Sequence, residues 1–411
     1  MEPARFMLLS AIILLVAVSE SKVDPDSGHI RIISIGESFY PETRLPFMLG
    51  ADPRIRYQPV PTNWYEGTFQ AVGSGREDAE KFLRLYIPRT YDRFIGGYDV
   101  ILLSDFEVDI IDGRQWSWME TSVRVDGMGI GKYEMNYDPA HWTTFDLFRN
   151  LPVYQAFPAS LAWGREFTGI GIYAAPLPQT GRPHPVIDLP NMKNGRIPID
   201  IGSGKAGYED PRPGSTVIAR YIPNDEPAVV IWEYGEGRAM TSVPGHDTIV
   251  WHLSDYWPYT VDYWINQAWY LAGIEIPPVI EILHQIRESS VLYSTQRTMA
   301  LSVIDFAEKF GASTGDLYRM LEDVDEAKSD ADRLYMEDDY AGSISGMELA
   351  LLGLARVAES AVEAKDAVLN WIYTIEWAIV SATSAIVGTL VWSLMVRRSL
   401  YRDVSLTRKS S

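Results

Sequence analysis

The sequence contains no cysteine in its 411 residues. This absence excludes disulfides, thiolate catalysis, zinc–cysteine sites and iron–sulfur ligation. No Asn-x-Ser/Thr triplet occurs either, so N-linked glycans are not expected. Histidine is scarce, and no ligand spacing is shared by His29, His141, His184, His252 and His284. We therefore expect no cofactor, and the fold must rely on the size of its hydrophobic core.

Positive charge is also in short supply. The chain has 36 Lys and Arg against 55 Asp and Glu, which gives a net charge of −19. Because part of the positive charge stands in the C-terminal tail, the rest of the chain is more acidic still. Such a balance argues against nucleic acid and anionic lipid surfaces as partners, and it mainly favours solubility.

Two long apolar runs stand at the two ends of the chain. Residues 6–18 have the length of a signal-peptide core and precede small residues, so we predict a signal peptide at 1–21. Residues 377–396 carry no charge, and about 20 helical residues span a hydrocarbon core of ~30 Å. We predict a transmembrane helix at 371–396 and a basic cytoplasmic tail at 397–411, because positive residues stay inside. The predicted location is the cell membrane, with a single span and the N-terminal domain outside.

The middle of the chain alternates apolar runs with amphipathic stretches, which is typical of an α/β domain. Residues 98–105 form a continuous apolar strand, as expected for a strand buried on both faces. Glycines at 129–133 indicate a backbone that something approaches closely. Short extended segments in 160–228 are predicted to cover one sheet edge. The other predicted strands are 30–35, 54–60, 228–232 and 239–243, and the helices are 78–85, 114–123 and 259–271.

The stretch from residue 229 to residue 273 organises this domain. Two apolar runs flank a polar turn with glycine, which predicts a strand, a tight turn and a second strand. Pro244-Gly245-His246-Asp247 then leaves the second strand, ahead of the amphipathic helix at 259–271. This places a histidine and a carboxylate at the carboxyl end of a strand, where open α/β sheets bind their ligands.

The same stretch resembles the end of the glutamine amidotransferase-like and trehalose-utilization-type family. The similar motifs are Tyr234-Gly235-Glu236-Gly237-Arg238, Gly245-His246-Asp247, Trp251 and Ala268-Trp269-Tyr270-Leu271-Ala272-Gly273. Earlier matches are Gly36-Glu37-Ser38-Phe39, Tyr98 to Asp105, Gly129 to Tyr133 and Leu151-Pro152-Val153. The resemblance implies a flavodoxin-like open parallel sheet of the class I amidotransferase type over residues 22–276.

The chain departs from this family where the chemistry takes place. In thiol amidotransferases the nucleophilic cysteine lies on a strained turn that falls within residues 131–135 here, and this window has neither Cys nor Ser. His246 matches the family's histidine, but Thr248 stands where the pairing glutamate is expected. The resemblance therefore implies a non-thiol member, a pseudoenzyme without glutamine hydrolysis.

The remaining polar residues at the predicted strand ends suggest two interpretations. The simpler one is that His246 ties down the loop between strand and helix through hydrogen bonds. The other is that His246, Asp247 and Glu134 form an acid–base group, or bind a metal together with Glu37 and Asp105. Aromatic residues add a carbohydrate hypothesis, because Trp251 and Trp257 lie in the loop, while Trp264 and Trp269 are spaced as core residues.

From residue 277 the composition changes to three helical stretches, about 278–310, 314–336 and from 345 onward. We predict a helical stalk over 277–370, packed as an antiparallel bundle beside the membrane. The leading hypothesis is a membrane-anchored surface protein whose degenerate amidotransferase-like domain binds a carbohydrate or a surface protein. The alternatives are a cysteine-independent hydrolase or sugar-modifying enzyme that uses His246, Asp247 and Glu134, and a purely structural spacer.

Overall fold

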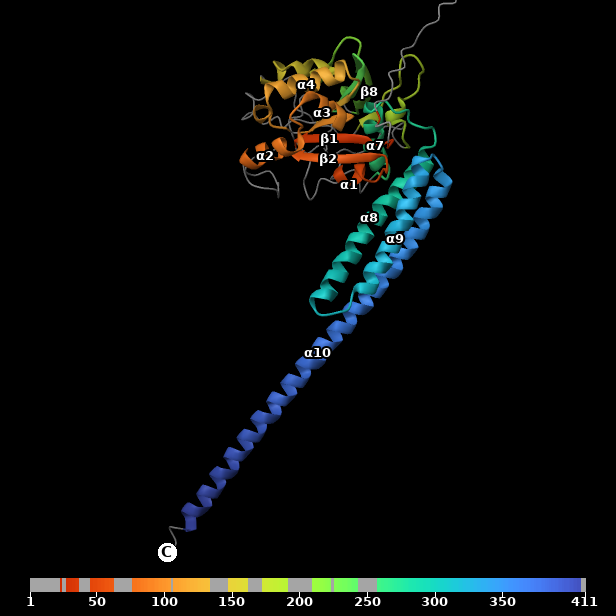
Figure 1. Cartoon of the computed structure of the whole chain (residues 1–411). Coiled ribbons are helices and arrows are strands. Elements are labelled where there is room, and N and C mark those ends of the chain that lie inside the picture. The colour runs from red at the N-terminus through yellow and green to blue at the C-terminus, as the bar shows by residue number, and fades with distance from the viewer. Residues whose placement is uncertain are drawn as a thin grey trace, which may run out of the picture. The chain divides into compact units, whose positions relative to one another are not determined.

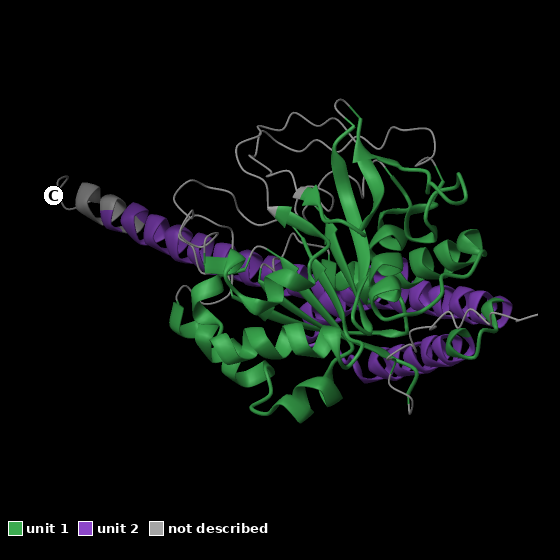
Figure 2. Ribbon diagram, turned by 90° about the horizontal axis from the view of Figure 1, so that it is seen from above, with its two compact units in different colours: residues 1–291, 335–340 green, residues 292–334, 341–411 purple. Residues whose placement is uncertain are grey.

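The computed structural model describes residues 23, 27–36, 45–62, 76–104, 106–133, 147–161, 172–190, 209–222, 225–242 and 257–407. Two compact units divide the chain (Figure 2). The first comprises Met1–Val291 and Tyr335–Tyr340, and the second comprises Leu292–Leu334 and Ala341–Ser411. The boundary lies inside helix α8 (Ile280–Lys309), so the first turns of α8 belong to the first unit.

The first unit is a mixed α/β domain (Figure 1). Its main sheet has eight strands in the order β2-β1-β3-β4-β10-β9-β8-β6. All neighbouring pairs from β2 to β10 are parallel, and the pairs from β10 to β6 are antiparallel. The parallel strands are β1 (Ile30–Gly36), β2 (Ile55–Pro61), β3 (Val100–Ser104), β4 (Gly129–Lys132) and β10 (Gly237–Ser242). The others are β6 (Ile172–Ala174), β8 (Thr216–Tyr221) and β9 (Pro227–Tyr234), while β5 (Ala159–Leu161) and β7 (Glu209–Pro211) form a separate pair.

The sheet is therefore mostly parallel, with five parallel strands and three antiparallel additions, and the predicted strand, turn and strand at 228–243 are confirmed by β9 and β10. Strands β9 and β10 are joined through Gly235 and Glu236, and Gly235 has a φ of 63°. A two-residue turn reverses the chain, so it can join only antiparallel strands. Once β9 runs backwards, β8 and β6 add to its free edge, and the segment predicted to cover a sheet edge extends the sheet instead. Within the predicted range 160–228, residues 162–171, 191–208 and 223–224 lie outside the described residues.

Both faces of the sheet are covered, as the continuous apolar pattern of β3 predicts. On one face the core contains Ile33, Ile101 and Ile130 together with Trp116 and Met119 of α4. The helices associated with this core are α2 (Arg76–Tyr86), α3 (Tyr91–Gly97) and α4 (Gly113–Arg124). The remaining elements of the unit are α1 (Leu45–Leu49), α7 (Thr260–Leu271) and the 3-10 turns Val108–Ile110, Pro152–Ala156 and Pro185–Ile187.

Helix α7 packs directly on the backbone of β4. A Cβ added at Gly129 would lie 2.2 Å from the carbonyl oxygen of Leu271, so no side chain fits between strand and helix. The close approach that the glycines of this strand indicate is thus confirmed, and the approaching group is a helix of the same unit. Trp264 and Trp269 of α7 are buried, which confirms their prediction as core residues.

The second unit is a helical bundle made by α8 from Leu292 onward, α9 (Gly315–Met336) and α10 (Tyr340–Thr407). The predicted helical stretches are confirmed, although α10 begins five residues earlier than the predicted position. Its core joins Ile304 of α8, Leu321 and Val324 of α9, and Leu354 and Val357 of α10. Helix α10 runs on for 68 residues in all (Figure 1).

Candidate functional site

All six residues that the sequence nominates for a site lie outside the described part of the chain: Glu37, Asp105, Glu134, His246, Asp247 and Trp251. The strands that precede them are described. Because β1, β3, β4 and β10 pair in parallel, their carboxyl ends lie along one edge of the sheet. We call this the carboxyl edge, and its described strand-end residues are Gly36, Ser104, Lys132, Thr241 and Ser242.

Lys132 is the residue at the carboxyl edge that sequence reasoning missed. It is the last residue of β4, is only 1% exposed, and pairs with Leu103 of β3 and Thr241 of β10. Residues that are directly opposite share a face of the sheet, so Lys132 and Thr241 lie on the same side. A buried ammonium group is unfavourable unless it is paired, and it can hold an anionic or carbonyl oxygen. The available signal was a lysine inside the window where the resembled family has its nucleophile.

Tyrosines lie on the other face of the sheet, among them Tyr57 in the first half of β2. The Tyr133 ring lies 4.8 Å from that of Trp264, between the sheet and α7. Burial raises the pKa of Tyr263 to about 12, an effect that Ser242 and Gln267 partly oppose. Burial likewise raises the pKa of Tyr57 and that of Tyr133. At neutral pH these tyrosines therefore keep their protons and can donate hydrogen bonds.

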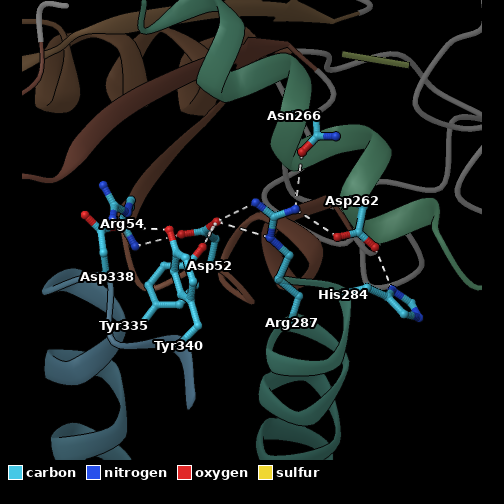
Figure 3. A network of polar contacts seen from close by, with 9 residues as sticks. All are labelled: Asp52, Arg54, Asp262, Asn266, His284, Arg287, Tyr335, Asp338 and Tyr340. Atoms are coloured by element: carbon cyan, nitrogen blue, oxygen red, sulfur yellow. Dashed lines mark hydrogen bonds and ion pairs between the residues drawn. The ribbon is translucent and has the colours of Figure 1, made fainter. Parts of the chain in front are cut away.

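A second polar cluster surrounds Arg287 of α8 (Figure 3). Its Nη2 donates to Asp52 Oδ2 at 3.0 Å, and its Nη1 donates to Asp262 Oδ1 at 2.8 Å. A further bond from Nη1 reaches Asn266 Oδ1 at 3.2 Å, and the guanidinium lies 5.0 Å from the ring centre of Trp269. Asp262, Asn266 and Trp269 belong to α7, whereas Asp52 precedes β2. The cluster therefore connects the start of α8 with two elements of the α/β domain.

The electrostatics of this cluster depend on complete burial. The side chains of Arg287, Asp52 and Asp262 are all 0% exposed. Burial disfavours the charged guanidinium, but the charges of neighbours that include Asp52 and Asp262 outweigh this effect and raise the pKa of Arg287. One buried cation between two buried carboxylates, each hydrogen-bonded to protein, is a structural arrangement. We therefore do not assign catalysis to it.

The same cluster holds the short segment Tyr335–Tyr340 in the first unit. The Tyr335 hydroxyl donates to Asp52 Oδ2 at 2.8 Å, and burial raises the pKa of this tyrosine well above its usual range. Arg54 Nη2 donates to Asp338 Oδ1 at 2.5 Å (Figure 3). The segment lies 283 residues after Asp52 in sequence, so these polar contacts explain why the end of α9 joins the α/β domain.

His284 forms the outer side of the cluster. Its Nδ1 lies 2.7 Å from Asp262 Oδ2, its ring stacks 4.2 Å from that of Tyr259, and its side chain is 15% exposed. The hydrogen bond to Asp262 raises the pKa of His284, with burial acting against it. Protonated His284 is thus stabilised by folding, which gives the first unit a pH-dependent contact.

We expect the His284→Gln variant to lose one component of the pH dependence of stability. A raised folded pKa stabilises fully below the unfolded value of about 6.5, and the contribution disappears as pH rises through the folded pKa. Wild type should therefore lose stability relative to the variant as the pH rises above about 6.5. Urea unfolding followed by tryptophan fluorescence measures this difference.

His184 provides the matched control. Burial, followed by the charge of Arg238, lowers the pKa of His184 to about 4. Its stabilising contribution is therefore present above about pH 6.5 and is lost as pH falls toward 4. His184→Asn should accordingly alter the pH dependence of stability only in this acidic range. If the free energy of unfolding changes equally with pH above neutrality in wild type and His284→Gln, the pH-dependent contact between His284 and Asp262 is contradicted.

Among the residues that the structure describes, no three His, Asp or Glu side chains are grouped so that they could hold a metal ion. Trp257, which the sequence places in a loop that could line a pocket, is 3% exposed, and its Nε1 donates to the carbonyl oxygen of Pro190 at 3.1 Å. This tryptophan therefore packs as a core residue.

Comparisons with known proteins add little to this geometry. No protein-family model matches the chain, and no curated protein matches it. Among solved structures, the chain is similar to cytoplasmic proteins STM3548 and STM1381 of Salmonella typhimurium, with identities of 16% and 13%. Each match covers 59% of this chain, and 98% and 99% of the respective other chain, with a TM-score of 0.42.

A third similar structure is the exo-beta-1,4-mannosidase Op5Man5 from Opitutaceae bacterium strain TAV5. The identity is 11%, the match covers 61% of this chain and 37% of the mannosidase, and the TM-score is 0.32. At these TM-scores the likeness carries no argument about function.

Proposed function

We propose that the chain is a single-pass membrane protein that presents a catalytically degenerate, amidotransferase-like domain outside the cytoplasm. There the domain binds a carbohydrate or a surface-protein partner. The observation that carries the proposal is helix α10: within Tyr340–Ser399 it contains an apolar window long enough to cross a membrane, none of which is buried. It is the one such helix among the residues that the structure describes.

Several side chains of this window support a lipid environment. Large apolar residues are exposed along its whole length, including Trp377, Ile379, Ile386, Leu390 and Leu394. In water such a surface would be a strong liability for association. The basic residues Arg397, Arg398 and Arg402 follow it, which supports a cytoplasmic position for the tail.

The strand order supports the finer description of the α/β domain. The five parallel strands follow one another in the order β2-β1-β3-β4-β10, which corresponds to the 2-1-3-4-5 order of flavodoxin-like sheets. The antiparallel strands are an addition to that frame at one side. Ligand binding at the carboxyl edge is the expectation for this topology, and the lack of a thiol supports binding over glutamine hydrolysis.

The alternative is a cysteine-independent hydrolase or sugar-modifying enzyme that uses His246, Asp247 and Glu134. Buried Lys132 is the observation that favours it. A fixed cation at the carboxyl edge can stabilise negative charge that develops on a substrate oxygen, which is a common source of rate enhancement. Glu134 follows this lysine by two residues in the sequence.

Cysteine labelling tests the membrane arrangement, because the natural chain has no cysteine to interfere. Gln179 is exposed in the first unit, so a Gln179→Cys chain should react with a membrane-impermeant maleimide in intact cells or spheroplasts. Ser410→Cys, in the tail, should react only after the membrane is permeabilised. The reverse pattern, or labelling of both without permeabilisation, would contradict the proposed topology.

A further inference from the structure

Helix α8 carries two rows of side chains with coiled-coil spacing. The inner row includes Tyr293, Ala300 and Ile304, which belong to the core of the bundle. The outer row repeats at alternating intervals of three and four residues, the spacing of a heptad seam. We call it the outer seam, and its members are Leu292, Gln296, Met299, Val303, Phe306 and, one residue beyond the end of α8, Phe310.

The outer seam is only partly covered by the second unit, because Val303 also packs against the core of the bundle. Leu292 is 45% exposed, Met299 64%, Phe306 37% and Phe310 50%, while Gln296 and Val303 are half-buried. An outward helix face is normally polar, and single exposed apolar residues need no explanation. A row that recurs over more than two heptads is different, because it matches the pattern by which two helices pack.

Charge shows which partner this seam fits. Residues 289–310, which contain the whole seam, carry two basic and two acidic residues and are therefore neutral overall, in a chain of net charge −19. Arg297 is already paired with Asp325 of α9 at 2.7 Å. Helix α9, by contrast, exposes Glu322, Asp323 and Glu326. The outer seam is therefore a surface at which two equally acidic chains can meet without repulsion between like charges.

We propose that two copies of this chain associate in parallel along the outer seam of α8. The parallel direction rests on the proposed membrane anchor, because two copies in one membrane share an orientation and a two-fold axis along the membrane normal. Each seam residue then faces its own counterpart: Met299 packs on Met299, and the two Gln296 amides hydrogen-bond across the axis. A polar residue at one seam position specifies this register over shifted ones.

Single cysteines test the seam in the full chain in its membrane. Leu292→Cys, Met299→Cys and Phe306→Cys should each form a disulfide-linked dimer with a mild oxidant. Thr298→Cys is the matched control, since it is equally accessible but points about 100° away from its neighbour Met299 on the helix. We expect at least ~10-fold less crosslinking for the control than for Met299→Cys. This ratio corresponds to about 1.4 kcal/mol.

The crosslinking pattern also separates this proposal from the one on which it rests. Crosslinking of Met299→Cys without Leu292→Cys or Phe306→Cys would indicate antiparallel pairing and overturn the shared orientation. Equal crosslinking at 298 and 299 would overturn the seam itself. Neither outcome changes the accessibility of Ser410→Cys, which reports the membrane topology alone.

A charge variant provides the second measurement. Leu292→Glu with Phe306→Glu leaves the bundle core intact, because both side chains are exposed, and it places two carboxylates in each seam. Full-length protein in mild detergent should shift from dimer to monomer, with self-association weakened ~100-fold or more, whereas Thr298→Glu should remain dimeric. A dimer that persists in the double variant would assign the contact to another surface, such as the membrane helix, and overturn the proposal.

Discussion

Replacing Arg287 by Met should destabilise the first unit by about 3–5 kcal/mol. The substitution removes the cation that lies 3.0 Å from Asp52 and 2.8 Å from Asp262, and it leaves two fully buried carboxylates without their ion pair. Methionine retains most of the volume, so the loss reports charge and hydrogen bonding more than packing. Amide exchange of α7 and β4 in the full-length protein measures this unit separately from the bundle.

Arg76→Met is the control for this prediction. Arg76 also has two acidic partners, Glu80 and Asp109, but it is 46% exposed, so its removal should change stability far less than removal of Arg287. Adding Asp52→Asn and Asp262→Asn to the Arg287→Met chain should recover part of the loss, because the uncompensated charges are then absent. A small effect of Arg287→Met, similar to that of Arg76→Met, would show that the carboxylates are hydrated or neutralised in another way.

Replacing Gly36 by Ala should cost at least about 4 kcal/mol. Gly36 ends β1 at a φ of 121°, and a Cβ at this position would lie 1.7 Å from the carbonyl oxygen of Ser104. The backbone of β3 must therefore shift or β1 must leave its register, and both strands lead into the candidate site. Denaturant unfolding of the full chain provides the measurement.

The loss at Gly36 has two causes, the contact of the new Cβ with Ser104 and the strain of a positive φ. Gly214→Ala separates them. Gly214 also has a left-handed backbone, with a φ of 93°, but no atom would lie within 4 Å of an added Cβ. Its substitution should cost only the conformational strain of about 1–2 kcal/mol. If both glycine variants lose the same stability, the contact with Ser104 is relieved by local movement and the β1–β3 junction is softer than its geometry indicates.

Local pattern was sufficient for most of the first unit. The apolar run that ends at Ser104, the prolines that border β2 and the apolar spacing of α7 each predict an element that the structure contains. Strand β2 is at the sheet edge, as its prolines require. These signals work because they depend on neighbours within about ten residues, where side-chain period and backbone restrictions act directly.

Pairing across long distances is what the sequence did not reveal. Asp52 and Arg287 are 235 residues apart, and no periodic pattern connects two single charged residues over such a separation. A partial signal existed, because Arg287 falls between Leu283 and Ser290 on the inward side of α8, where an apolar residue is expected. A charged residue on a buried stripe predicts a buried partner, but only the fold identifies it.

The candidate site could likewise be predicted only in part from the sequence. The resemblance points to strand ends, and the parallel pairing of β1, β3, β4 and β10 places those ends along one edge. Lys132 could not be selected from the sequence, because a single lysine in a short strand gives no sign of whether its side chain is buried. Its burial is a property of the central position of β4 in the sheet, which strand order determines.

Helix α10 fixes the rotation of its apolar segment relative to its residues in the bundle. It contains 68 residues and no proline, so at ~1.5 Å per residue it is about 100 Å of continuous helix shared by the bundle and the apolar segment. Each residue adds about 100° of rotation, so one residue inserted after Glu363 would turn the apolar segment by that angle against the bundle, and seven would turn it by only about 20°. Rotational phase is thus conserved along the helix, so the residues that pack in the bundle determine which direction each side of the apolar segment faces.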